Sequence, residues 1–170
     1  DAFRLCNRCY RMGSYSRIQC ERINSMRIDI EHILLELQGL PEYEEQLSLQ
    51  VTKDNVGGEG RLTKLVNTEQ DFNVYAYDLP YTNSVLDSLG MYRSRLMKLA
   101  PKSCYTYHRD PTQRMHIPLL TNENNFFVID DIVSRYPADG SHYLVDTRKK
   151  HTFVNASMEY RLHIVGCVDS

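Results

Sequence analysis

The sequence predicts a mainly β protein in which an N-terminal helical layer covers a β core. Helical periodicity is confined to the part of the chain before Gly90, whereas short apolar runs separated by turn residues dominate the part after it. The 170 residues, 42% hydrophobic and 25% charged, match one ordinary globular domain. We therefore expect a single domain over 1–170, with helical and loop cover and the first strands in 1–90 and the β core in 91–170.

The helical part begins with apolar residues that recur mostly at three- and four-residue steps from Arg17 to Leu37, which favours one amphipathic helix. Gly39 and Pro41 would end it. Alternation over Gln46 to Thr52 then predicts a half-buried strand. The apolar residues on the predicted helix face are Ile18, Ile23, Met26, Ile30, Ile33, Leu34 and Leu37.

The next segment, Asp54 to Gly60, contains three glycines and reads as a loop. It lacks the G-x-x-x-x-G-K-S/T pattern of a phosphate-binding loop. A short helix over Leu79 to Leu89 should end at Gly90. The later runs predict a closed or sandwiched antiparallel sheet. They are Tyr92 to Leu99, Met115 to Leu120, Phe126 to Asp130, His142 to Asp146, His151 to Asn155 and Arg161 to Val168.

Composition limits the partners and the compartment. The formal net charge of −2 provides no basic field that would indicate a nucleic-acid partner. No apolar run reaches membrane-spanning length and no signal-peptide order is visible at the N-terminus, so we expect a cytoplasmic protein without a membrane anchor. The oligomeric state is not predicted.

Five scattered cysteines argue against a secreted disulfide framework and favour free thiols in a reducing compartment. Cys6 and Cys9 form a C-x-x-C, but no second Cys/His pair follows at zinc-finger or zinc-ribbon spacing. The others are Cys20, Cys104 and Cys167.

Two histidines and a carboxylate in the β half are candidate metal ligands. His108 and Asp110 are two residues apart, so an extended segment would direct both side chains the same way, and His151 begins a later predicted strand. Such a set matches the facial triad of non-haem iron(II) enzymes, which leaves coordination positions open. H-x-D alone is a common pair of surface residues, so the surrounding sequence decides its meaning.

Four segments in order resemble the aspartyl/asparaginyl β-hydroxylase family. Arg95 to Asp110 resembles its strand, Pro-turn and H-x-D segment, and Arg114 to Leu119 resembles its R-x-H-x-P/G-L strand. His151 to Asn155 and Arg161 to His163 resemble its H-x-V-x-N and R-x-H elements. The resemblance implies a double-stranded β-helix (a jelly-roll, cupin-like fold), iron(II), 2-oxoglutarate and dioxygen. The implied reaction is hydroxylation of a free amino acid or of an amino-acid side chain in a peptide or protein.

The resemblance also implies roles for individual residues. His108, Asp110 and His151 match the metal ligands, and Arg161 matches the arginine that pairs with the distal carboxylate of 2-oxoglutarate. A guanidinium suits that role because it can meet a carboxylate through two parallel hydrogen bonds. The residues that match positions near the cosubstrate or substrate are His116 and Arg114.

Several of these side chains also have a plain structural interpretation. His116 on an apolar strand is as readily a hydrogen-bonded core histidine, and Arg114 is similar. Tyr105 and Tyr107 either line the pocket mouth or, more often for such residues, pack in the core. The remaining histidines are read as structural, for His142 and His163, or as a helix-surface residue, for His32.

Two departures from the family pattern qualify the match. Asp139-Gly140-Ser141 stands where many relatives have Gly-Glu, which keeps a turn through Gly140 but loses the acid. Asp110 is present, whereas some members lack the triad carboxylate, and its presence argues against halogenation. Before His108 the resemblance fades, so the first 90 residues are interpreted from pattern alone.

Two other functions remain compatible with the sequence. One is a cupin-like metal-binding protein without oxygenase activity, which would not need Arg161 as an oxoacid anchor. The other is a structural or interaction protein that meets an acidic partner through its N-terminal arginines. Those arginines are Arg4, Arg8, Arg11, Arg17 and Arg22.

Overall fold

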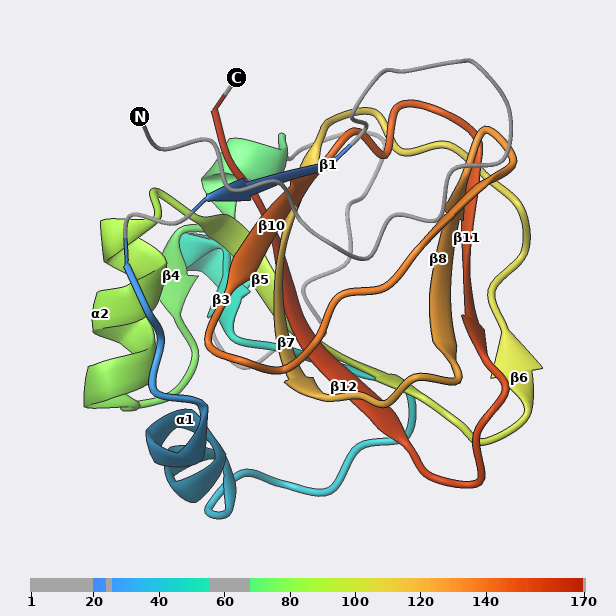
Figure 1. Ribbon diagram of the computed structural model, residues 1–170. Helices are drawn as coiled ribbons and strands as arrows, with labels where there is room; N and C mark the ends of the chain where they lie inside the picture. The colour runs from blue at the N-terminus through green and yellow to red at the C-terminus, as the bar shows by residue number, and fades with distance from the viewer. Residues whose placement is uncertain (1–19, 24–25, 56–67, 170) are drawn as a thin grey trace, which may run out of the picture.

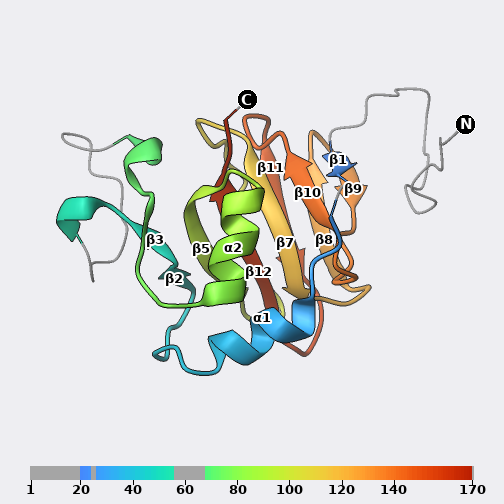
Figure 2. The ribbon, with the colours of Figure 1, turned by 90° about the vertical axis from the view of Figure 1, so that its left-hand side faces the viewer.

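The computed structural model describes residues 20–23, 26–55 and 68–169, which form three layers (Figure 1). Two helices, α1 (Ile30–Leu37) and α2 (Pro80–Ser88), lie against the outer face of a six-stranded sheet, and a four-stranded sheet faces its other side (Figures 1 and 2). All strand pairs are antiparallel. The prediction of a mainly β protein with a helical cover and sandwiched sheets is confirmed.

The large sheet has the order β1-β10-β7-β12-β5-β2, the small sheet the order β6-β11-β8-β9, and β3 pairs with β4. From β5 onward each strand lies in the other sheet from its predecessor, except for the β8–β9 hairpin. The strands are β1 Cys20–Ile23, β2 Gln46–Ser48, β3 Gln50–Val51, β4 Val74–Tyr75, β5 Tyr92–Leu99, β6 Ser103–Cys104, β7 Arg114–Leu120, β8 Asn125–Ile129, β9 Ile132–Ser134, β10 His142–Val145, β11 His151–Asn155 and β12 Arg161–Cys167. Two 3₁₀ turns, η1 (Lys53–Asn55) and η2 (Glu69–Asp71), complete the elements.

The large sheet separates two cores, because alternate residues of a strand point to opposite faces. Ile117 and Ile164 pack with the helices in the outer core. The inner core between the sheets contains Phe127, Phe153 and Tyr143. This inner space also receives the charged and polar residues of β7 and β12, so it is where the candidate site lies.

The predicted helix from Arg17 to Leu37 is too long. The structure has a strand at Cys20–Ile23, paired with β10, and a helix only at Ile30–Leu37. Asp29 ends the extended segment and caps the helix, because its side chain accepts a hydrogen bond from the backbone N–H of His32 at 3.1 Å. Main-chain pairing with a sheet edge therefore takes the place of the predicted helix at Ile23, whereas Ile18 lies outside the described residues.

The predicted strand over Gln46 to Thr52 is two short strands in different sheets. β2 pairs with β5, whereas β3 pairs with β4. Residues 48 to 52 are all buried, so the alternation does not mark a half-exposed strand. Gln50 is buried without penalty because its side chain donates to the Met91 carbonyl and accepts from the Ser94 N–H.

Other predictions agree with the structure to within one residue at each end. Helix α2 ends before Gly90, whose φ of +61° is the left-handed conformation expected there, and β5 and β11 have the predicted bounds. Gly140 also has a positive φ, and a Cβ there would lie 2.6 Å from the Ile28 carbonyl oxygen. Most of the glycine-rich loop, like Cys6 and Cys9, lies outside the described residues. Cys104 and Cys167 are free thiols.

Neither helix in the described part of the chain has the length and apolar character that spanning a bilayer requires.

Candidate metal centre

The two histidines of the predicted triad are placed by one backbone bridge. The N–H of His108 donates to the carbonyl of His151 at 3.0 Å, and the N–H of His151 donates to the carbonyl of His108 at 2.9 Å. Residues paired in this way across antiparallel strands present their side chains on the same face. The two imidazole rings accordingly lie 4.4 Å apart between centroids.

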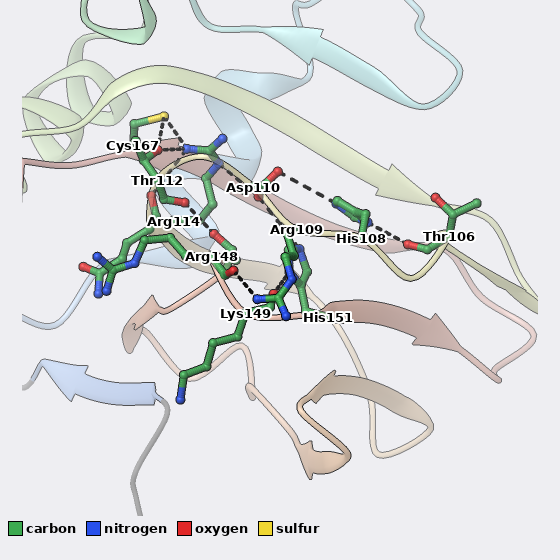
Figure 3. A network of polar contacts seen from close by, with 12 residues as sticks. Thr106, His108, Arg109, Asp110, Thr112, Arg114, Arg148, Lys149, His151 and Cys167 are labelled. Carbon is green, nitrogen blue, oxygen red and sulfur yellow. Dashed lines mark hydrogen bonds and ion pairs between the residues drawn. The ribbon is translucent and has the colours of Figure 1, made fainter.

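Asp110 completes the cluster from the segment that follows His108. Its backbone N–H donates to the Thr147 carbonyl at 2.9 Å, which fixes the turn of the chain. Its two carboxylate oxygens lie 3.8 Å from Nε2 of His108 and 3.8 Å from Nε2 of His151 (Figure 3). One ligand atom from each of the three residues lies within 4.8 Å of the other two. The structure thus brings the three predicted ligands together.

The histidine rings are oriented to present Nε2. Nδ1 of His108 lies 2.6 Å from the Thr106 carbonyl, and Nδ1 of His151 lies 2.9 Å from the Lys149 carbonyl. A carbonyl can only accept, so each Nδ1 carries the proton and each Nε2 keeps a free lone pair. Burial lowers the pKa of His151, which favours the neutral ring that a metal needs.

Arg114 sits beside Asp110 and is fully engaged with acidic groups. Its Nε lies 3.3 Å from Asp110, and its Nη2 lies 2.7 Å from Glu69, which also pairs with Arg93. Burial opposes ionisation of Glu69, but hydrogen bonds from Arg114 and Thr112 and the nearby arginine charges lower its pKa to about 2. Arg114 therefore helps to orient the triad carboxylate of Asp110. Its guanidinium is occupied by these carboxylates and is not free to bind a ligand.

Glu69 was not among the predicted site residues. It comes from the 3₁₀ turn η2 and meets Arg114 across 45 positions of sequence. Thr112 joins the same group through a hydrogen bond of 2.5 Å to Glu69. Nothing in the local pattern around Glu69 distinguishes it from a surface carboxylate, so only the packing identifies it.

Arg161 lies deeper between the sheets, with 1% of its surface exposed. Its guanidinium stands 3.5 Å from the centre of the Phe153 ring, and Nη2 contacts Nδ1 of His163. Burial lowers its pKa to about 9, so the group stays charged at neutral pH. Among the described residues no carboxylate pairs with Arg161, and its Nε has no hydrogen-bond partner.

Other unsatisfied polar atoms gather around Arg161. Nδ1 of His116, Nε2 of His163 and the hydroxyl of Tyr105 are buried without a hydrogen-bond partner among the described residues. His116 lies 5.8 Å from His163 between ring centroids, and both have pKa values well below the usual one, because burial and the Arg161 charge oppose protonation. Buried polar groups are normally paired, so this group has the character of a ligand-binding site.

Aromatic rings connect Arg161 with the triad. Phe153 contacts Phe127, whose ring stacks on His151 with an interplanar angle of 9°. The triad reaches the surface on the His108 side, where that side chain is 42% exposed. On its inner side the His151 side chain is only 6% exposed. Tyr107 is exposed at this end, whereas Tyr105 packs in the inner core. Tyr105 is partly buried and packs in the inner core, which agrees in part with its core interpretation. His142 and His163 are buried, as their structural interpretation predicts.

Comparison with known proteins agrees with this geometry. Residues 21–169 match the family model described as aspartyl/asparaginyl beta-hydroxylase. A search of curated proteins found no match. Since the family model spans nearly the whole chain, including every residue of the site, the chain belongs to the aspartyl/asparaginyl β-hydroxylase family.

Proposed function

We propose that this protein is an iron(II)- and 2-oxoglutarate-dependent hydroxylase of an amino acid or of an amino-acid side chain in a peptide or protein. Hydroxylase activity is what family membership suggests. The observation that carries the cofactor assignment is a fully buried Arg161 with no carboxylate partner among the described residues, in the same inter-sheet space as the His108, Asp110 and His151 cluster.

The three clustered side chains are suited to iron(II). Two neutral imidazoles and one carboxylate form a mixed nitrogen and oxygen set, which suits an octahedral ion with open positions better than a closed tetrahedral zinc site. When bound, iron(II) supplies the activation of dioxygen that C–H hydroxylation requires. The carbonyls of Thr106 and Lys149 hold the rings of His108 and His151, and the Arg114 guanidinium holds the Asp110 carboxylate.

Arg161 is suited to hold the distal carboxylate of 2-oxoglutarate. An isolated buried charge is strongly unfavourable, so a guanidinium without a carboxylate partner favours binding of an anion. Its unpaired Nε, together with the Tyr105 hydroxyl and the two inner histidines, offers hydrogen bonds to such a ligand. The overall reaction would convert a substrate C–H, dioxygen and 2-oxoglutarate into the alcohol, succinate and carbon dioxide.

The topology supports a finer description of the fold. We propose that the six- and four-stranded sheets are the two sheets of a double-stranded β-helix. The support is the repeated crossing of the chain between two facing antiparallel sheets (Figure 1).

The test has two stages. Metal-free protein is titrated anaerobically with iron(II) and then with 2-oxoglutarate, after which amino acids and peptides are screened for stimulated succinate formation. We expect one metal per chain, lost in both His108→Ala and His151→Ala, and metal-dependent binding of 2-oxoglutarate. Metal binding without any 2-oxoglutarate binding would favour a cupin-like metal-binding protein and reject the proposal.

A further inference from the structure

A second arginine projects into the same space from β5. Arg95 pairs with Val165 of β12, and Val165 pairs with His116 of β7. Residues directly opposite one another on antiparallel strands share a face. Arg95 therefore lies on the inner face of the large sheet, in one row with His116 and two strands away from it, about 10 Å between backbones.

Among the described residues, Nε of the Arg95 guanidinium has no hydrogen-bond partner. Nη1 donates to the side-chain oxygen of Gln46 on the edge strand β2 at 3.2 Å. Nε is buried and unsatisfied, and no residue in the described ranges forms an ion pair with Arg95. Nε and Nη2 form the fork that meets a carboxylate through two parallel hydrogen bonds. Gln46 thus holds the Arg95 guanidinium through Nη1 and leaves the Nε and Nη2 fork available for a ligand carboxylate.

The charges around Arg95 favour an anionic ligand. Burial and the neighbouring charges of Arg93 and Arg114 lower its pKa to about 10, while Asp110 opposes this effect. Glu69 forms ion pairs with Arg93 and Arg114, and Asp110 forms an ion pair with Arg114. No acidic group in the described part of the chain is left to balance Arg95.

Arg95 and Arg161 lie at different positions along the strand direction of the large sheet. Arg161 pairs with Leu99, four residues along β5 from Arg95, which separates the two backbone positions by roughly 13 Å. The two guanidiniums are thereby suited to two separate carboxylates. Arg95 is the one within electrostatic reach of the triad residue Asp110.

We propose that Arg95, held by Gln46, is the anchor for a carboxylate of the substrate, so that the substrate of this enzyme is an anionic amino acid or an acidic residue of a peptide. This inference rests on the proposed function, with Arg161 taking the cosubstrate. It assigns substrate selection to β5, a strand that contributes no metal ligand.

The experiment compares Arg95→Gln and Arg95→Lys with the wild type and with Arg135→Gln, which removes an exposed arginine. Manganese-loaded protein is titrated calorimetrically with 2-oxoglutarate, and iron-loaded protein is assayed for succinate formation. The panel contains free L-amino acids, their carboxamides, and capped peptides in which an aspartate side chain is the only carboxylate. The free acids and the capped peptides separate the two sources of the carboxylate.

We expect at least one carboxylate probe to stimulate the wild type and its amide to fail. Arg95→Gln should lower stimulation at limiting probe concentration at least about tenfold, with Arg95→Lys intermediate, while 2-oxoglutarate affinity stays unchanged. Equal stimulation by acid and amide, no stimulation by any carboxylate, or undiminished stimulation of Arg95→Gln would overturn the inference. So would an equal loss of 2-oxoglutarate affinity, which would place Arg95 on the cosubstrate. A wild type that binds no 2-oxoglutarate would reject the proposed function itself.

Discussion

At the scale of single residues, the inner face of the large sheet is unusual in carrying buried positive charge beyond what its own acids balance. Arg114 is matched by Glu69 and Asp110, whereas Arg161 is matched by no described carboxylate. Leaving a buried charge without a partner typically costs several kcal/mol. Without an anionic partner this arginine costs stability, and a bound anionic ligand would recover part of that free energy.

Arg161→Lys should weaken 2-oxoglutarate binding while leaving metal affinity nearly intact. Lysine keeps the charge but loses the fork, so the expected loss is about 1 to 3 kcal/mol, which is about fivefold or more in affinity. Calorimetry on manganese-loaded protein measures it, with Arg135→Lys as the control at an exposed position. Unaltered affinity in both Arg161→Lys and Arg161→Ala would place the anchor elsewhere.

Glu69→Gln should destabilise the fold because it leaves Arg114 and Arg93 without their shared carboxylate. Both partners of the Glu69–Arg114 pair are nearly buried, at 10% and 3% side-chain exposure, so we expect a loss of about 2 to 5 kcal/mol in the free energy of unfolding. Urea denaturation at neutral pH measures it. Glu123→Gln, at an exposed carboxylate, is the control, and a similar small loss in both variants would contradict the role given to Glu69.

The triad cluster and the candidate role of Arg161 were predicted from the sequence because the local H-x-D and R-x-H spacings occur within segments that resemble the family in order. His108 and Asp110 alternate on an extended segment, and Arg161 and His163 do the same on β12. Arg95 stood within a segment matched to the family, but its role depends on which face of β5 is buried. That face is set by pairing with β12, which no spacing along the chain reveals.

At the scale of elements, helix α2 begins with a cap supplied from a different helix. Its N-cap residue, Leu79, offers no side-chain hydrogen bond. Glu36 of α1 instead accepts from the backbone N–H groups of Tyr81 and Thr82, both at 2.8 Å. Free N–H groups at a helix N-terminus favour a carboxylate, so this contact joins the two covering helices.

Glu36→Ala should therefore cost about 0.5 to 2 kcal/mol of unfolding free energy, the range for losing a helix cap. Metal affinity should not change, because the helices contact the outer face of the large sheet. Urea denaturation compares it with Glu31→Ala, an exposed carboxylate of the same helix. Equal destabilisation by the two changes would show that the contact adds nothing.

The elements that sequence reasoning misplaced lie near the N-terminus. Periodicity extended the first helix into Cys20–Ile23, which pairs with β10 instead. The alternation of Gln46 to Thr52 gave no sign that the chain leaves one sheet for another at Leu49, whose N–H and carbonyl bond to Ser94 and Ala76. Strands such as β5 and β11 were predictable because turn residues bound them on both sides.

At the scale of the whole molecule, the buried histidines make stability depend on pH. The pKa values of His116 and His163 lie well below 6.5 in the folded protein, chiefly because of burial. Below about pH 6.5 the unfolded chain binds more protons than the folded one, so stability rises with pH. Each histidine adds up to about 1.4 kcal/mol per pH unit between pH 5 and 6.5.

Urea denaturation of metal-free protein at pH 5 and pH 7 tests this dependence. His163→Gln should flatten the slope relative to the wild type. An unchanged slope in His163→Gln would mean that this histidine takes up its proton in the folded state.

The central claim is that the triad and Arg161 form one site, in which a metal and an oxoacid are bound together. The most direct measurement is calorimetric titration of 2-oxoglutarate into three samples: manganese-loaded wild type, metal-free wild type and His151→Ala in the presence of manganese. We predict one tight site in the first sample and much weaker binding in the other two, since coupling between the two ligands is reciprocal. The same 2-oxoglutarate affinity in all three samples, or no binding in the first, would contradict the account.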